Sequence, residues 1–173
     1  GNRVYLVTTS QTVVANSNVT IDAGSAIWIM GAGFVQVQSA ARLNLNGTLV
    51  APPGRASLQI TASGSLTLAN TNRKFDPTLL TTDSGTICGN LIQLTHDAFP
   101  AAGGIIDGER FVGTQSIGYL NLEKPVDVRM GPAFYNVSST MRFGHWNGRF
   151  GGSHMDLGQT ATHFSWAGSC DAA

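Results

Sequence analysis

Residues 18–21 (NVTI) return as residues 42–45 (RLNL) and again as residues 65–68 (SLTL), at offsets of 24 and then 23 residues. Each copy alternates a polar side chain with an apolar one, which is the period-2 pattern of a β-strand with one buried face. A strand of four residues cannot bury its own apolar face, so neighbouring copies must pack against one another. The stretch therefore predicts a fold built from stacked repeats.

Two more families of short segments lie between these copies. Residues 26–29 (AIWI) return 22 residues later as residues 48–51 (TLVA), and residues 34–37 (FVQV) return 23 residues later as residues 57–60 (SLQI). About three short strands in every 22–24 residues predict a right-handed, single-stranded parallel β-helix, which is a solenoid within the all-β class. Like strands of successive coils would stack roughly 4.8 Å apart and satisfy each other's backbone hydrogen bonds.

The predicted register places apolar side chains in ladders that run along the inside of the solenoid. At roughly 1.5–3 kcal/mol for each buried aliphatic side chain, these ladders would be the main source of stability. Trp28 alternates with Ile27 and Ile29, so it should face outward, as should Asn44 and Thr67. The ladders of the leading family are Val19–Leu43–Leu66 and Ile21–Leu45–Leu68.

Composition restricts the class of function. Ten basic and ten acidic side chains among 173 residues give a formal net charge of zero, so no basic face for nucleic acid is expected. No run of 18 apolar residues occurs, so we expect no membrane insertion. Only 12% of the residues are charged, and Gly, Ser, Thr and Asn are abundant, which fits a secreted or virion protein with many tight turns.

The chain is expected to form a single domain over residues 1–173. Residues 4–14 (VYLVTTSQTVV) predict a strand pair around a polar turn, which would cap the first coil and cover its edge. The periodicity ends at Ala69, and residues 70–84 are expected to project as a loop, with a short helix within residues 77–82. The expected divisions are a cap over 1–15, regular coils over 16–68, the loop over 69–84 and less regular coils over 85–173. Further strands are predicted at residues 86–88, 91–94, 103–108, 116–122 and 126–130.

The C-terminal third carries a family resemblance. Residues 126–141 (VDVRMGPAFYNVSSTM) run from a strand through Gly and Pro to a Tyr and then to a Ser- and Thr-rich strand. A glycine-rich segment, residues 148–153 (GRFGGS), and a predicted strand, residues 160–166 (TATHFSW), follow. This part of the chain resembles the opening of pectate-lyase-like parallel β-helix domains, as in phage tailspikes and related polysaccharide-degrading proteins. It departs from the family pattern, in which Pro-Gly usually precedes the Tyr segment, because Gly131 here comes before Pro132.

The resemblance implies a virion protein, part of a tailspike or fibre that acts as a rigid rod in host attachment. Its partners would be other virion proteins and host-surface polysaccharide, and open coil ends with an apolar lateral face favour a homotrimer. One alternative is a polysaccharide lyase or glycoside hydrolase whose active coils lie outside this chain or at a subunit interface. The other is a secreted bacterial adhesin, which would be extracellular. The family's catalytic carboxylates lie on later coils, so none carries over to a numbered position.

Asp107 and Glu109 are the candidate catalytic residues, because glycoside hydrolysis requires two carboxylates that flank the bond. They are the closest acidic pair, and on a strand two residues at this spacing point to the same face. In the alternative reading, Asp107 precedes Gly108 in a turn and its carboxylate binds local amides.

Glycan contact is predicted for a polar and aromatic cluster, since sugar rings stack on aromatic faces and polar side chains bind their hydroxyls. The candidate glycan-binding residues are Arg142, His145, Trp146, Asn147 and Arg149. His145, His154 and His163 are nine residues apart, but successive strands of a coil face different sides, so we expect no metal site and no cofactor. Cys88 and Cys170 are expected to be two free thiols rather than a disulfide.

Overall fold

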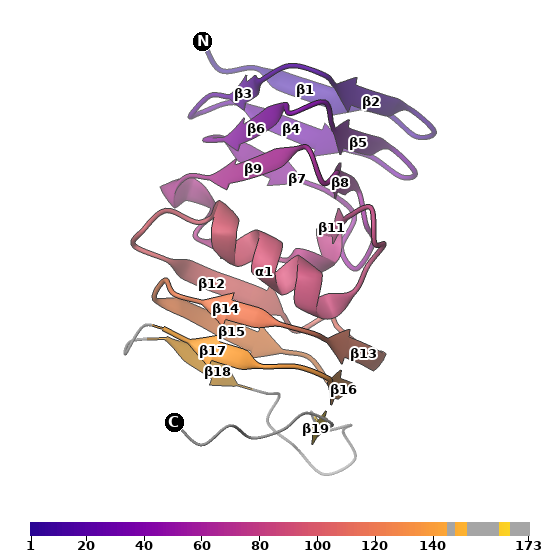
Figure 1. Cartoon of the computed structure of the whole chain (residues 1–173). Helices are drawn as coiled ribbons and strands as arrows, with labels where there is room; N and C mark the ends of the chain where they lie inside the picture. The colour runs from indigo at the N-terminus through magenta and orange to yellow at the C-terminus, as the bar shows by residue number, and fades with distance from the viewer. Residues whose placement is uncertain (145–147, 152–162, 167–173) are drawn as a thin grey trace.

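The computed structural model describes residues 1–144, 148–151 and 163–166. Within them, most residues lie in short strands, and the strands of the described sheets pair in parallel. The all-β class with parallel sheets is therefore confirmed, although one α-helix interrupts the strands. Figure 1 shows the strands in layers that follow one another from the N-terminus downward, with the helix between the upper and the lower layers. No helix in the described part of the chain combines the length and the apolar character that crossing a membrane requires.

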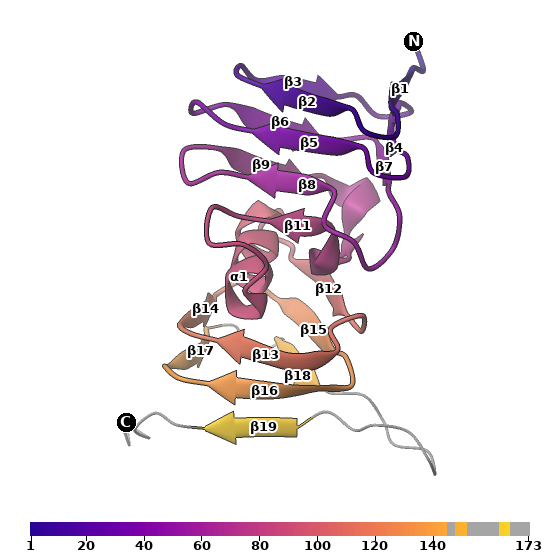
Figure 2. The ribbon, with the colours of Figure 1, turned by 90° about the vertical axis from the view of Figure 1, so that its right-hand side faces the viewer.

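Three parallel sheets form the upper layers (Figures 1 and 2). The first contains β1 (Val4–Val7), β4 (Ala26–Ile29) and β7 (Thr48–Val50). The second contains β2 (Thr12–Ala15), β5 (Phe34–Val37), β8 (Leu58–Ile60) and β11 (Leu80–Thr81). The third contains β3 (Val19–Ile21), β6 (Arg42–Leu45) and β9 (Ser65–Leu68). The repeat families of the sequence are therefore the sheets of the fold.

The predicted register is confirmed in the third sheet. The paired rows are Val19–Leu43–Leu66 and Ile21–Leu45–Leu68. The four leucines of these rows are at most 6% exposed, whereas Thr67 is exposed and Asn44 is only half-buried. The Asn44 amide donates a hydrogen bond to Thr20 Oγ1 of the neighbouring strand (3.2 Å). Trp28 is 43% exposed, so it faces outward as the alternation predicted.

Glycines shape the corners between the strands. Gly24 has a φ of +80°, in the left-handed region that residues with a Cβ rarely adopt. A side chain at Gly47 would overlap the backbone carbonyl oxygens of Asp22 and Ser25, which lie one repeat earlier in the chain. Successive layers therefore approach so closely at this corner that only glycine fits.

The N-terminal segment differs from the expected strand pair. Among the described sheets, β1 pairs with β4 and β2 pairs with β5, and β1 and β2 do not pair with each other. Tyr5 and Val13 are in register with buried residues of the next layer, yet they remain 41% and 37% exposed at this end. Residues 4–14 thus form the first layer of two sheets and do not cover its edge.

The segment expected to project as a loop is part of the stack. It contains two 3-10 helices, η1 (Asn70–Asn72) and η2 (Pro77–Leu79), and the two-residue strands β10 (Lys74–Phe75) and β11. Phe75 and Leu80 are almost fully buried, and their burial holds the segment against the core. The short helix predicted within residues 77–82 is confirmed as η2.

The strands predicted at residues 86–88 and 91–94 are wrong, because these residues lead into and form the helix α1 (Cys88–Ala98). The buried face of α1 follows the helical period of i, i+3, i+4 and i+7. Its residues are Cys88, Leu91, Ile92 and Thr95. The helix contacts β9 on one side and β14 (Leu120–Leu122) on the other, so it occupies the place of a strand between them (Figure 1).

The lower layers form three further parallel sheets. One contains β10, β12 (Gly104–Gly108), β15 (Val126–Met130) and β18 (Arg149–Gly151). Another contains β13 (Gly113–Ile117), β16 (Ala133–Val137) and β19 (His163–Trp166), and the last pairs β14 with β17 (Met141–Phe143). The strands predicted at 103–108 and 126–130 are confirmed, whereas the segment 116–122 contains the end of β13, a bend and β14.

Candidate functional site

The sheet β10–β12–β15–β18 collects charged side chains on its outer side. Phe75, Ile106 and Val128 form a buried row of this sheet, so the residues before and after them point outward. One outward row is Lys74–Ile105–Asp127–Arg149, and the next contains Asp107 paired with Arg129. We call these outward side chains, together with the adjacent Arg73, the charged face.

Two ion pairs connect neighbours on the charged face. Lys74 Nζ lies 3.0 Å from Asp107 Oδ2, and Arg129 Nε lies 3.3 Å from Asp127 Oδ2. The Lys74 side chain is 55% exposed and that of Asp107 only 14%, so the carboxylate lies deeper than its partner. Asp107 Oδ1 is buried and has no hydrogen-bond partner among the described residues. Because buried polar atoms are normally paired, Asp107 retains the capacity to accept one more hydrogen bond.

Two hollows adjoin Lys74 on this face. The larger has a volume of about 340 Å³, and its border includes Arg73, Lys74, Asp127 and Arg149. The smaller has a volume of about 210 Å³, and its border includes Asn72, Lys74, Asp76 and Asp107. Volumes at or below the lower end of the usual range for ligand pockets suit a single sugar unit or an anion rather than a large cofactor.

Asp76 has a structural role within the smaller hollow. One of its carboxylate oxygens accepts hydrogen bonds from the backbone N–H and the hydroxyl of Thr78, which caps η2. The other oxygen lies 2.7 Å from Arg110 NH1. Both oxygens of Asp76 are therefore occupied, which leaves Asp107 as the carboxylate of this hollow with an unpartnered oxygen.

The structure separates the two predicted catalytic residues. Asp107 lies on β12 and borders the smaller hollow, but the strand ends at Gly108 and Glu109 lies exposed in the turn that follows. Strand alternation therefore does not extend to Glu109, and Glu109 borders neither of the two hollows on the charged face.

The predicted glycan-binding cluster is described only in part. Arg149 lies on β18 at the charged face, whereas Arg142 lies on β17 in a different sheet, paired with Asn121. His145, Trp146 and Asn147 lie outside the described residues. Of the cluster, only Arg149 is placed beside a hollow.

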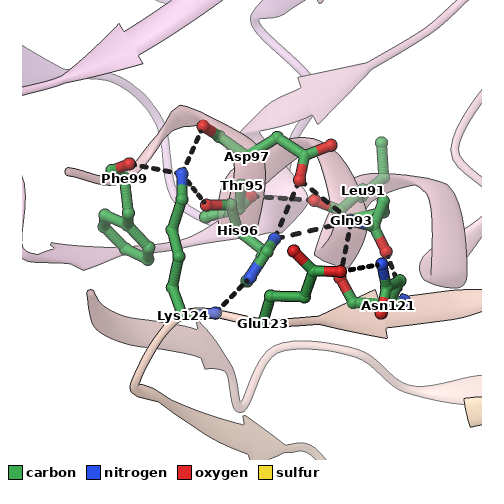
Figure 3. A network of polar contacts seen from close by, with 9 residues as sticks. All are labelled: Leu91, Gln93, Thr95, His96, Asp97, Phe99, Asn121, Glu123 and Lys124. Atoms are coloured by element: carbon green, nitrogen blue, oxygen red, sulfur yellow. Dashed lines mark hydrogen bonds and ion pairs between the residues drawn. The ribbon is translucent and has the colours of Figure 1, made fainter. Parts of the chain in front are cut away.

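A second polar network lies between α1 and β14 (Figure 3). The Gln93 side chain accepts a hydrogen bond from Asn121 N (2.8 Å) and donates one to Asn121 O (3.1 Å). These are the bonds that a neighbouring strand would make, so one side chain of the helix completes the edge of β14. His96 Nε2 accepts from the backbone N–H of Lys124 (3.0 Å), which leaves Nδ1 with the ring proton, donated to Asp97 Oδ1 (2.8 Å).

Lys124 fixes the end of α1. Its Nζ donates hydrogen bonds to the carbonyl oxygens of His96 (3.1 Å), Asp97 (2.7 Å) and Phe99 (2.6 Å), where a cation also complements the helix dipole. A His–Asp pair is a common general base, but His96 is only 3% exposed and both of its nitrogens are occupied. The network therefore holds α1 in place and offers no group to a substrate.

Three groups near α1 have shifted pKa values. Burial opposes ionisation of Asp97, but hydrogen bonds from His96 and Gln93 and the charge of Lys124 outweigh it and lower its pKa. Burial raises the pKa of the Cys88 thiol to about 12, so the thiol is protonated and unreactive at neutral pH. Burial also raises the pKa of Tyr135, whose hydroxyl donates to the carbonyl oxygen of Gly131 (3.1 Å).

Cysteine and histidine positions are also described only in part. Cys88 is a free, buried thiol, and Cys170 lies outside the described residues. His145 and His154 are also outside them, while the backbone of His163 belongs to β19. Among the described residues, no three His, Cys, Asp or Glu side chains gather in a group that could hold a metal ion.

Comparison of the chain with protein-family models, with curated proteins and with solved structures found no match in any of the three. The resemblance of residues 126–166 to tailspike-type β-helix domains therefore stays a prediction. Function has to be argued from the stacking of the strands and from the charged face.

Proposed function

We propose that the chain is a right-handed parallel β-helix with about three short strands per coil, and that it serves as a rigid rod in a virion tailspike or fibre. The observation that carries this proposal is the parallel, in-register pairing of strands one repeat apart in three upper sheets. Pairing of this kind occupies the backbone donors and acceptors of each inner layer, which makes a rod stiff and resistant to proteases. The tailspike-like segment from residue 126 supports the same assignment.

The proposed rod binds host-surface glycan on the charged face. Carboxylate and guanidinium groups bind sugar hydroxyls through charge-assisted hydrogen bonds, and shallow hollows leave room for individual sugar units. Lys74 lies between two such hollows, and Asp107 has an acceptor oxygen in reserve. Both features support a binding role for this face.

Side-by-side association into a homotrimer is supported by an apolar row on the opposite kind of surface. Leu6, Trp28 and Val50 occupy the same position in three successive strands and are 55%, 43% and 43% exposed. Val4 and Met30 are exposed beside them. A continuous apolar row on the outside of a protein is typical of a protein–protein contact.

The association is testable with Trp28→Gln. Because Trp28 faces outward, the change should leave the melting temperature nearly unchanged and weaken the trimer. Light scattering at micromolar concentration should give three times the monomer mass for the natural chain and a lower mass for the variant. A monomer mass for both proteins would contradict the trimer.

Depolymerase activity is the second candidate, favoured by the unpartnered Oδ1 of Asp107 beside a hollow. One experiment separates the functions: the purified chain is incubated with capsular and lipopolysaccharide glycans, and retention and new reducing ends are both measured. Retention without cleavage supports a binding rod. Cleavage that disappears in Asp107→Asn, with folding intact, supports the enzyme. Neither retention nor cleavage would overturn the role in glycan binding.

A further inference from the structure

The charged face carries an excess of positive charge although the chain as a whole is neutral. It has four cationic side chains and two carboxylates. The two carboxylates are already matched, because Asp107 pairs with Lys74 and Asp127 pairs with Arg129. Two guanidinium groups, those of Arg73 and Arg149, have no carboxylate partner among the described residues.

These two guanidinium groups border the same hollow. Arg73 and Arg149 both contribute to the larger hollow, of about 340 Å³, together with Lys74 and Asp127. One hydrogen bond of the Arg73 guanidinium is already made, to the carbonyl oxygen of Ala102 (3.2 Å), which positions its side chain and leaves other N–H donors available. Guanidinium groups bind carboxylate and sulfate oxygens with two parallel hydrogen bonds, in a geometry that an ammonium group does not reproduce.

We infer that the larger hollow binds the anionic group of an acidic sugar unit, with Arg73 and Arg149 as the anion-binding residues. Asp127 accepts a hydroxyl of the same sugar, because its carboxylate is held at the edge of the hollow by Arg129 and is 36% exposed. This inference rests on the proposed glycan binding and adds to it the substrate class, an acidic polysaccharide. The anionic group is a carboxylate or a sulfate ester, which share this chemistry.

Size and charge argue against larger polyanions. Nucleic acid binding uses many cationic side chains in a row along the backbone, whereas this hollow has two unmatched guanidinium groups and one carboxylate on its border. A carboxylate at the border repels a continuous phosphate chain but accepts hydrogen bonds from sugar hydroxyls. The mixed lining therefore fits a sugar with one anionic group and several hydroxyls.

The test uses the full chain and three polymers, alginate for carboxylate, dextran sulfate for sulfate ester and dextran as the neutral backbone. Affinity is measured by titration calorimetry in about 50 mM and about 300 mM salt, with screening expected to weaken anion binding at the higher salt. The variants are Arg73→Gln and Arg149→Gln, and the control is Arg42→Gln, which removes an exposed arginine from β6 in a different sheet. Thermal melting confirms that all four proteins are folded.

We expect an anionic polymer to bind at least about tenfold more tightly than dextran, and each hollow variant to lose about tenfold in affinity, as the loss of one charge-assisted hydrogen bond predicts. Arg42→Gln should match the natural chain. Preference for alginate or for dextran sulfate identifies the anionic group. Equal binding of all three polymers, or equal losses in the hollow and control variants, would overturn the inference and leave glycan binding intact. Binding of none of the three polymers would overturn the acidic-glycan assignment, while retention of other glycans would still support the proposed function.

Discussion

The layers above α1 and the layer that contains it are held to their neighbours in different ways. Above α1, backbone groups of one strand bind backbone groups of the same strand position in the next repeat, as between β6 and β9. At α1, the side chains of Gln93 and His96 bind the backbone of Asn121 and Lys124. The first arrangement needs only an alternating pattern of apolar residues, and the second needs particular polar side chains at particular positions.

This difference teaches where each region is sensitive to substitution. In the upper layers, one outward residue is nearly interchangeable with another, because the backbone supplies the bonds and the inward side chains supply the burial. In the helical layer, a single polar side chain replaces part of a strand, so its loss leaves buried backbone groups without partners. Three predictions test the contrast.

The largest effect is expected for Leu45→Asp in the upper layers. Leu45 is fully buried in the middle of a ladder, and an aspartate there would place an unpaired charge in the core. The variant should fail to fold into a soluble protein, as judged by circular dichroism and thermal melting. Thr67→Asp, an outward position on β9, is the matched control and should change stability by less than about 0.5 kcal/mol. A Leu45→Asp protein as stable as the natural chain would rule the register out.

A smaller but clear loss is expected for Lys124→Met in the helical layer. The change removes a cation and three hydrogen bonds to the last carbonyl groups of α1, while the methionine keeps most of the packing of the stem. The free energy of unfolding should fall by about 2–3 kcal/mol in urea denaturation. The neighbouring exposed residue provides the control, since Glu123→Gln keeps an oxygen that can accept from Asn121. Equal stability of the two variants would show that Lys124 does not fix the helix.

The smallest effect is a pH dependence linked to Asp97. Its pKa is lower in the folded chain than in the unfolded chain, so the unfolded state binds more protons between the two pKa values. The stabilisation is therefore fully present above about pH 4 and is lost as the pH falls through the folded pKa. Asp97 is 61% exposed, so the contribution is less than about 1 kcal/mol.

Asp97→Asn isolates that contribution. Other carboxylates titrate equally in both proteins, so the difference in melting temperature between the natural chain and the variant reports Asp97 alone. We expect the natural chain to be the more stable at pH 6 and the difference to shrink toward pH 3. A difference that stays constant across this range would contradict the linkage.

The sequence predicted the upper layers well because strand stacking obeys a local rule. Alternation at residues 18–21, 42–45 and 65–68 determines which side chains face the core, and the repeat length determines which strands pair. The helix α1 was missed because a short apolar run such as residues 91–94 fits a strand or a helix equally well. A period count over the whole segment, from Cys88 to Thr95, would have favoured the helix.

The candidate site was predicted only at single residues. Asp107 and Arg149 were named from the sequence, but their reasons were a carboxylate pair and an aromatic cluster rather than the charged face. Arg73, Lys74 and Asp127 were not named, because residues 70–84 were expected to project away from the sheet. The strand β10 that brings Lys74 beside Ile105 has only two residues, too few to show an alternating pattern.

By itself, the sequence determined the strand repeat, the inward ladders and the outward position of Trp28, because period-2 alternation and repeat length act within a few residues of chain. Only the tertiary structure decided that α1 takes the place of a strand and that Arg73 and Arg149 share a hollow. These two arginines lie 76 residues apart in the chain and meet only when three pairings of the sheet bring β10 and β18 to one face. Contacts between distant segments depend on the sum of all the pairings between them, and no local pattern encodes that sum.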